Sequence, residues 1–125
     1  MKYVIEGGKK LSGEILISGN KNAVFPVVAA ALLTSQEVII ENVGQIKDAQ
    51  ILVQILKELG VNVKWQGSSL VIQALEIKTS SLPKELMTKL RGSIVLAGAI
   101  LARVGRVSFF HPGGDIIGKF AHIKI

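Results

Sequence analysis

The sequence has no cysteine, few aromatic residues and no long hydrophobic run. The absence of cysteine from 125 residues excludes disulfide bonds, zinc–thiolate sites and a cysteine nucleophile. Aromatic residues make up only 5% of the chain, too few to alternate with basic residues as single-strand nucleic-acid binders require. The longest apolar run, residues 23–33, contains a proline and is far shorter than the roughly 20 residues that span a bilayer. The first residues contain no signal-peptide core either, so we expect a soluble, cytoplasmic protein without a nucleic-acid or membrane partner.

Acidic residues are also scarce relative to basic ones. Lysine and arginine total 15 against 9 acidic residues, which gives a formal net charge of +6. Such an excess favours an anionic partner, and because no basic run exceeds two residues we expect a small phosphorylated molecule. Charge that only keeps the protein soluble is the alternative. The hydrophobic content of 49% excludes a disordered tail, and the length fits one ordinary domain better than two.

Hydrophobic periodicity predicts an α/β fold. Runs typical of strands occur at residues 3–6, 14–18, 38–43, 61–65, 70–74 and 106–110. Helical patterns occupy residues 23–34, 48–60 and 83–102, the last of them bent or divided near Arg91 and Gly92. Residues 66–69 are predicted to form a hairpin loop.

Several residues predict where these helices begin and end. Either Asn20 or Ser18 is expected to cap the first helix, which is apolar nearly all round and should be buried on most sides. Pro26 is expected in its first turn. Asp48 is expected to cap or begin the second helix, and Gly60 to end it.

A weak internal repeat supports a modular architecture. Residues 29–33 and 38–40 recur as residues 97–101 and 106–108, each copy being an Ala/Gly-rich helix, a short turn and a strand. If the similarity is not chance, the chain holds one α/β unit and part of a second, and we expect it to be a fragment.

Two cations are candidates for anion binding. Lys21 lies between a predicted strand and the start of a helix, where the helix dipole repels a cation unless an anion binds between them. A solvated loop lysine is the alternative. Arg91 interrupts an apolar segment, and its planar guanidinium suits a phosphate or a carboxylate. An exposed helix residue or a structural ion pair is the alternative there.

Residues 111–115 form a glycine-bearing loop that ends in Asp115. An aspartate in a closed apolar site can act as a general acid, although an ordinary turn aspartate has the same pattern. His111 and His122 are not part of a plausible metal-ligand cluster, and no phosphate-binding loop or dinucleotide motif is present. We therefore expect neither a metal nor a cofactor.

Four motifs resemble a known family when taken in order. They are residues 11–23, with Ser-Gly-Asn-Lys-Asn-Ala at their end, the helix–strand junction ending Leu59-Gly60-Val61, Leu90-Arg91-Gly92-Ser93, and residues 112–118. This series is similar to that of the UDP-N-acetylglucosamine 1-carboxyvinyltransferases, of the enolpyruvyl transferase family. The related 3-phosphoshikimate 1-carboxyvinyltransferases carry Gly-Ser-Lys-Ser at the first motif, so Asn22 disfavours that alternative.

The resemblance implies a reaction and a set of residues. The family transfers the enolpyruvyl group of phosphoenolpyruvate to the 3′-hydroxyl of UDP-N-acetylglucosamine, the first committed step of peptidoglycan synthesis. Lys21 matches a catalytic lysine that contacts phosphoenolpyruvate, and Asn22 an asparagine that contacts the sugar nucleotide. Arg91 matches an arginine of the anionic site, expected to bind UDP-N-acetylglucosamine. Asp115 stands where most members have a proton-donating cysteine, which implies resistance to fosfomycin, an inhibitor that alkylates that cysteine.

The resemblance also implies a fold and an incomplete site. Members are two-domain enzymes built from repeated α/β units as an inside-out barrel, so residues 1–19 would be strands of the other domain. Residues 20–125 would then be a partial domain of about one and a half units. Phe120 occupies a position where the family has arginine, for which the neighbouring Lys119 could substitute. We expect the chain alone to be inactive without the C-terminal part as its partner; the alternative is a non-catalytic module that binds a sugar nucleotide.

Overall fold

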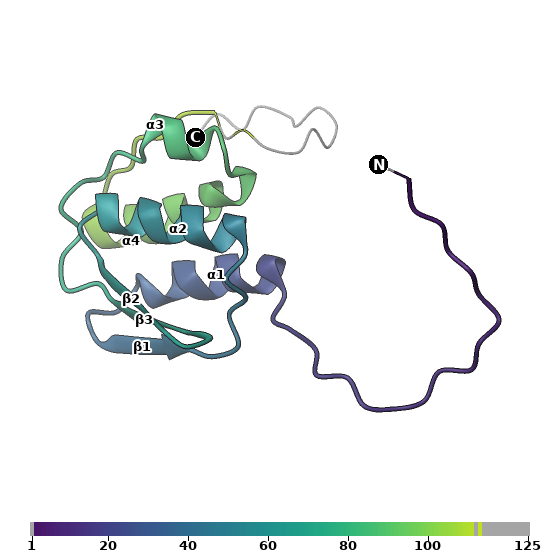
Figure 1. Ribbon diagram of the computed structural model, residues 1–125. Helices are drawn as coiled ribbons and strands as arrows, with labels where there is room; N and C mark the ends of the chain where they lie inside the picture. Colours follow the sequence, from purple (N-terminus) through teal and green to yellow (C-terminus); the bar gives the residue numbers. More distant parts are fainter. Residues whose placement is uncertain (1, 112, 114–125) are drawn as a thin grey trace.

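The computed structural model describes residues 2–111 and residue 113, and it confirms an α/β architecture. A layer of helices covers one face of a small sheet, and the N-terminal segment leads away from this body (Figure 1). In chain order the described elements are α1 (Lys21–Ala31), β1 (Glu37–Ile40), α2 (Lys47–Glu58), β2 (Asn62–Gln66), β3 (Ser69–Gln73), α3 (Lys84–Met87), the 3-10 helix η1 (Arg91–Val95) and α4 (Leu96–Val104).

The described strands form one antiparallel sheet in the order β1-β3-β2. Strands β2 and β3 form the predicted hairpin, and Gly67 adopts a φ of 60° in the tight turn between them. Alternate side chains on the inner face pack against the helices. They are Val38, Ile40, Val63, Trp65, Leu70 and Ile72.

Helices α1, α2 and α4 bury their apolar faces together above the sheet. Helix α2 has the clearest amphipathic pattern, and its buried residues lie at helical spacing. The largest fully buried side chains are mostly aliphatic: Val28, Leu32, Leu52, Ile55, Leu56, Leu59, Leu70, Ile72, Leu82, Met87, Leu96 and Ile100. This core explains how a chain with few aromatic residues holds three helices on one sheet.

Two predicted strands near the N-terminus are absent from the structure. Residues 3–6 and 14–18 belong to no described strand, and their apolar side chains are exposed. A strand exists only where a second backbone accepts and donates its hydrogen bonds. The hydrogen bond that Ile17 accepts comes from the side chain of Asn42, so it does not extend a backbone ladder. Whether residues 1–19 belong to another domain stays a prediction.

The predicted strand at residues 106–110 is reduced to a single bridge. Ser108 pairs with Ser81 in parallel, its amide donating to the carbonyl of Ser80 and its carbonyl accepting from the amide of Leu82. The prediction of a full strand was wrong because the chain around Ser81 aligns with it at only one position before α3 begins.

Both of the first two helices begin one or two residues before the predicted helical pattern. Asn20 caps α1, which confirms one of the two predicted caps, but the helix starts at Lys21, so Pro26 falls in its second turn and not its first. Asp48 does not cap α2: Ile46 is the N-cap residue and makes no side-chain capping hydrogen bond.

Helix α1 is also less buried than the prediction held. Pro26, Val27 and Ala30 are exposed, since the described part of the chain covers only one side of the helix. The long helical pattern at residues 83–102 divides as expected, into α3, η1 and α4.

Candidate functional site

Helices α1, α2 and the η1–α4 pair all begin on the same side of the helical layer. In Figure 1 their N-termini lie on the side from which the N-terminal segment departs. Helix α1 packs against α2, α4 and η1, so these ends are neighbours in space. The first amides of a helix have no partner within the helix, and they carry the positive end of its dipole. This edge therefore favours an anion, and two of the predicted cations lie on it.

The residues immediately before α1 are constrained by their contacts, and these contacts determine where Lys21 lies. The Asn20 side chain accepts a hydrogen bond of 2.7 Å from the backbone amide of Asn22, and this cap fixes the first turn. A Cβ atom at Gly19 would collide with the carbonyl oxygen of Asn42, so only glycine fits there. Asn42 itself has a φ of 54°, and its side chain donates to the carbonyl oxygen of Ile17 at 3.5 Å. Lys21 and Asn22 thus occupy a defined position at the start of α1.

Lys21 forms an ion pair that the sequence analysis did not predict. Its Nζ atom lies 2.9 Å from Oδ2 of Asp48, in the first turn of α2. The pair links the N-terminal ends of two helices that are 27 residues apart in sequence. One feature of the sequence could have drawn attention to Asp48: aspartate is rare, and Asp48 and Asp115 are the only two in the chain.

Arg91 lies at the start of η1, close to α1. A Cβ atom at the next residue, Gly92, would collide with the ring of Phe25, so η1 approaches α1 as closely as glycine permits. The buried hydroxyl of Ser93 donates to the carbonyl oxygen of Leu90 at 2.6 Å and closes this turn. Lys21 precedes Phe25 by about one helical turn. The structure therefore places Arg91 and Lys21 on contacting elements, as their joint assignment to an anionic site requires.

The described part of the loop before Asp115 is anchored to the end of α3. The amide of Gly113 donates to the carbonyl oxygen of Met87 at 2.9 Å, and a Cβ atom at Gly113 would collide with the Thr88 carbonyl. Nearby, the Lys84 ammonium lies 5.5 Å from the centre of the Phe110 ring. Asp115 itself lies outside the described residues, as do Lys119, Phe120 and His122.

Neither a metal site nor a membrane span is found where the structure describes the chain. Within residues 2–111 and 113, no three histidine or acidic side chains come together in a way that could hold a metal ion. In the same residues no helix combines the length and apolar character needed to cross a bilayer.

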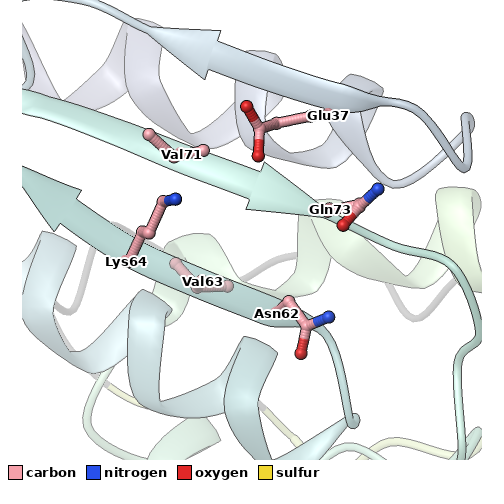
Figure 2. A pocket seen from close by; sticks show the side chains of 6 residues that line it. All are labelled: Glu37, Asn62, Val63, Lys64, Val71 and Gln73. Carbon is pink, nitrogen blue, oxygen red and sulfur yellow. The ribbon is translucent and has the colours of Figure 1, made fainter.

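A groove of about 320 Å³ lies elsewhere, on the outer face of the sheet (Figure 2). It is lined by Glu37, Asn62, Val63, Lys64, Val71 and Gln73. None of the predicted site residues borders it, and its two charges, from Glu37 and Lys64, are of opposite sign. An anion has little reason to bind there. The helical edge that carries Lys21 and Arg91 is the better candidate.

Most of the chain is similar in sequence to known proteins. The model of the family described as EPSP synthase (3-phosphoshikimate 1-carboxyvinyltransferase) matches residues 5–119. A UDP-N-acetylglucosamine 1-carboxyvinyltransferase of Bradyrhizobium diazoefficiens is 45% identical over 120 residues, which are 95% of this chain and 28% of that protein. Its counterpart from Borreliella burgdorferi is 41% identical over 117 residues, 94% of this chain and 27% of the relative.

A solved structure is similar as well. The crystal structure of the enolpyruvyl transferase NikO from Streptomyces tendae matches with a TM-score of 0.68 and 32% identity, covering 79% of this chain and 23% of that one. The resemblance drawn from the four motifs is thereby confirmed. The chain spans little more than a quarter of the length of the curated relatives it matches.

Proposed function

This chain belongs to the EPSP synthase family, and we propose that it is part of an enzyme that transfers the enolpyruvyl group of phosphoenolpyruvate to UDP-N-acetylglucosamine. The names of the relatives at 41% and 45% identity support this acceptor over shikimate 3-phosphate. Through this reaction the enzyme would act in peptidoglycan synthesis in the cytoplasm, and so in cell shape and division.

The observation that carries the proposal is the pair of cations at the helical edge. Lys21 lies at the first position of α1, and Arg91 at the first position of η1, which packs against α1. Both substrates are anionic: phosphoenolpyruvate carries a phosphate and a carboxylate, and UDP-N-acetylglucosamine carries a diphosphate. An ammonium group and a guanidinium group suit anions of these kinds. The positive ends of the helix dipoles add to the same field.

The roles follow from these positions and from the resemblance. Lys21 holds the anionic groups of phosphoenolpyruvate, Asn22 contacts the sugar nucleotide, and Arg91 binds a phosphate oxygen of UDP-N-acetylglucosamine. Asp115, protonated in the closed complex, donates its proton to the methylene carbon of phosphoenolpyruvate. The sugar hydroxyl adds to the adjacent carbon and loses its own proton. The bond from that carbon to phosphate then breaks, and the new methyl group loses a proton to restore the double bond.

The isolated chain is expected to be inactive, because its residues supply only one side of such a site. The test compares the 125-residue chain with the complete enzyme that carries it, measuring phosphate release from phosphoenolpyruvate with UDP-N-acetylglucosamine as acceptor. Enolpyruvyl transfer to UDP-N-acetylglucosamine by the complete enzyme, and none by the isolated chain, supports the proposal. Transfer to shikimate 3-phosphate and not to UDP-N-acetylglucosamine would show that shikimate 3-phosphate is the acceptor.

Binding to the chain alone tests the alternative function. Tight binding of UDP-N-acetylglucosamine by the 125-residue chain, measured by isothermal titration, with no transfer by the complete enzyme, would favour a non-catalytic binding module. Transfer by the complete enzyme together with weak binding by the chain would exclude that module.

A further inference from the structure

The ion pair between Lys21 and Asp48 contributes little to the stability of the protein, so stability does not account for its presence. Its atoms are 2.9 Å apart, but the two side chains remain 45% and 29% exposed. Exposed pairs of this kind add little to the free energy of unfolding, since water screens them and ordering both side chains has an entropic cost. The pair also keeps a cation at the first position of α1, where the helix dipole opposes it.

Asp48 is the better fixed of the two partners. It lies in the first turn of α2, where a carboxylate is favoured by the helix dipole. The residues that follow it, Ala49 and Ile51, are buried in the core, so the backbone that carries Asp48 cannot shift freely. Lys21 has a long flexible side chain, and its ammonium group is directed by the carboxylate of Asp48.

We propose that Asp48 is a positioning residue that holds Nζ of Lys21 at the helical edge, ready for the phosphoenolpyruvate anion. This inference rests on the function proposed above. An ammonium group has three donors, so one hydrogen bond to Asp48 is compatible with another to an anionic oxygen. Because Asp48 already orders the lysine side chain, substrate binding does not carry the entropic cost of ordering it, and the affinity is higher.

The test measures KM and kcat in the complete enzyme for a set of Asp48 variants. Asp48→Asn keeps the size and an acceptor atom but removes the charge, and we expect it to raise KM for phosphoenolpyruvate about tenfold. KM for the sugar nucleotide and the melting temperature should stay nearly unchanged. Asp48→Glu restores the charge and should recover part of the affinity. Glu85→Gln, which removes another first-turn carboxylate, in α3, is the matched control and should leave both KM values unchanged.

A double-mutant cycle with Lys21→Met decides whether Asp48 acts through Lys21. If it does, Asp48→Asn raises KM for phosphoenolpyruvate in the native background but causes no further rise in the Lys21→Met background. An unchanged KM in Asp48→Asn, or an equal effect in both backgrounds, would overturn the inference. If Lys21→Met alone raises KM, the proposed function stands even when the role of Asp48 fails. If Lys21→Met binds phosphoenolpyruvate normally, or the native enzyme transfers nothing, the proposed function fails and the inference with it.

Discussion

The ring of Phe25 in α1 lies directly against Gly92 in η1, with no room for a Cβ atom between them. This contact brings the start of η1, and with it Arg91, to the helix that begins with Lys21. The glycine is thus required by packing, and the packing in turn determines how close the two candidate cations can lie.

Substituting Gly92 with alanine should therefore destabilise the protein. The new methyl group meets the buried Phe25 ring, and relieving such an overlap in a core costs about 1–3 kcal/mol. Urea denaturation followed by circular dichroism measures the change. Gly98→Ala is the control: it lies in α4 with open space around it, so it should stabilise the helix by about 0.5–1 kcal/mol. Equal effects of the two substitutions would contradict the packing argument.

Arg103 should contribute to stability through the backbone. Its guanidinium group donates to the carbonyl oxygen of Leu32 at 2.8 Å and to that of Ala74 at 3.0 Å, joining α4 to the ends of α1 and β3. Arg103→Met leaves these carbonyl groups without that donor and should lower the free energy of unfolding by about 1–3 kcal/mol. Thermal denaturation measures the loss of stability in Arg103→Met and in the control Arg106→Met, which changes an exposed arginine. A loss no greater at Arg103 than at Arg106 would show that these two hydrogen bonds contribute nothing.

The segment before α1 should exchange its amide hydrogens rapidly in the isolated chain. Residues 3–18 are exposed and form no described strand, whereas β3 is paired on both sides. Amides exchange when their hydrogen bonds are absent or open, so hydrogen exchange read by mass spectrometry should show protection in β3 and none before residue 19. Exposed apolar residues such as Ile15 and Leu16 also make this segment prone to association. Strong protection there at low concentration would mean that the segment has found a partner.

The identity of residue 115 should decide the response to fosfomycin. If Asp115 is the proton donor, Asp115→Asn should abolish transfer by the complete enzyme, because an amide cannot donate that proton. Asp115→Cys should retain transfer and become sensitive to fosfomycin, while the native enzyme resists it. Full activity in Asp115→Asn would assign the proton to another group.

Local determinants were read correctly from the sequence. Asn20 caps α1 because a short side-chain acceptor before a helix finds an unpaired amide wherever the rest of the chain lies. The hairpin between β2 and β3 formed as expected, since Gly67 allows the turn and the strands on either side alternate. The division of the last helix near Arg91 was likewise visible in its pattern.

The sequence predicted only part of the candidate site. The resemblance proposes Lys21 and Arg91, whose elements are in contact in the structure, but the sequence predicted Asp48 only as the start of a helix. Its partner lies 27 residues away, and no local pattern encodes which lysine a carboxylate will meet after folding.

What the sequence by itself determined, then, is the family and the helix boundaries near Asn20 and Gly60. Tertiary structure alone decided the sheet order β1-β3-β2, the contact of Gly92 with Phe25 and the pairing of Lys21 with Asp48. It also left residues 3–6 and 14–18 without strands. The physical reason is the same throughout: caps and turns need only neighbouring atoms, whereas strands, packed rings and ion pairs need partners that folding brings from elsewhere in the chain.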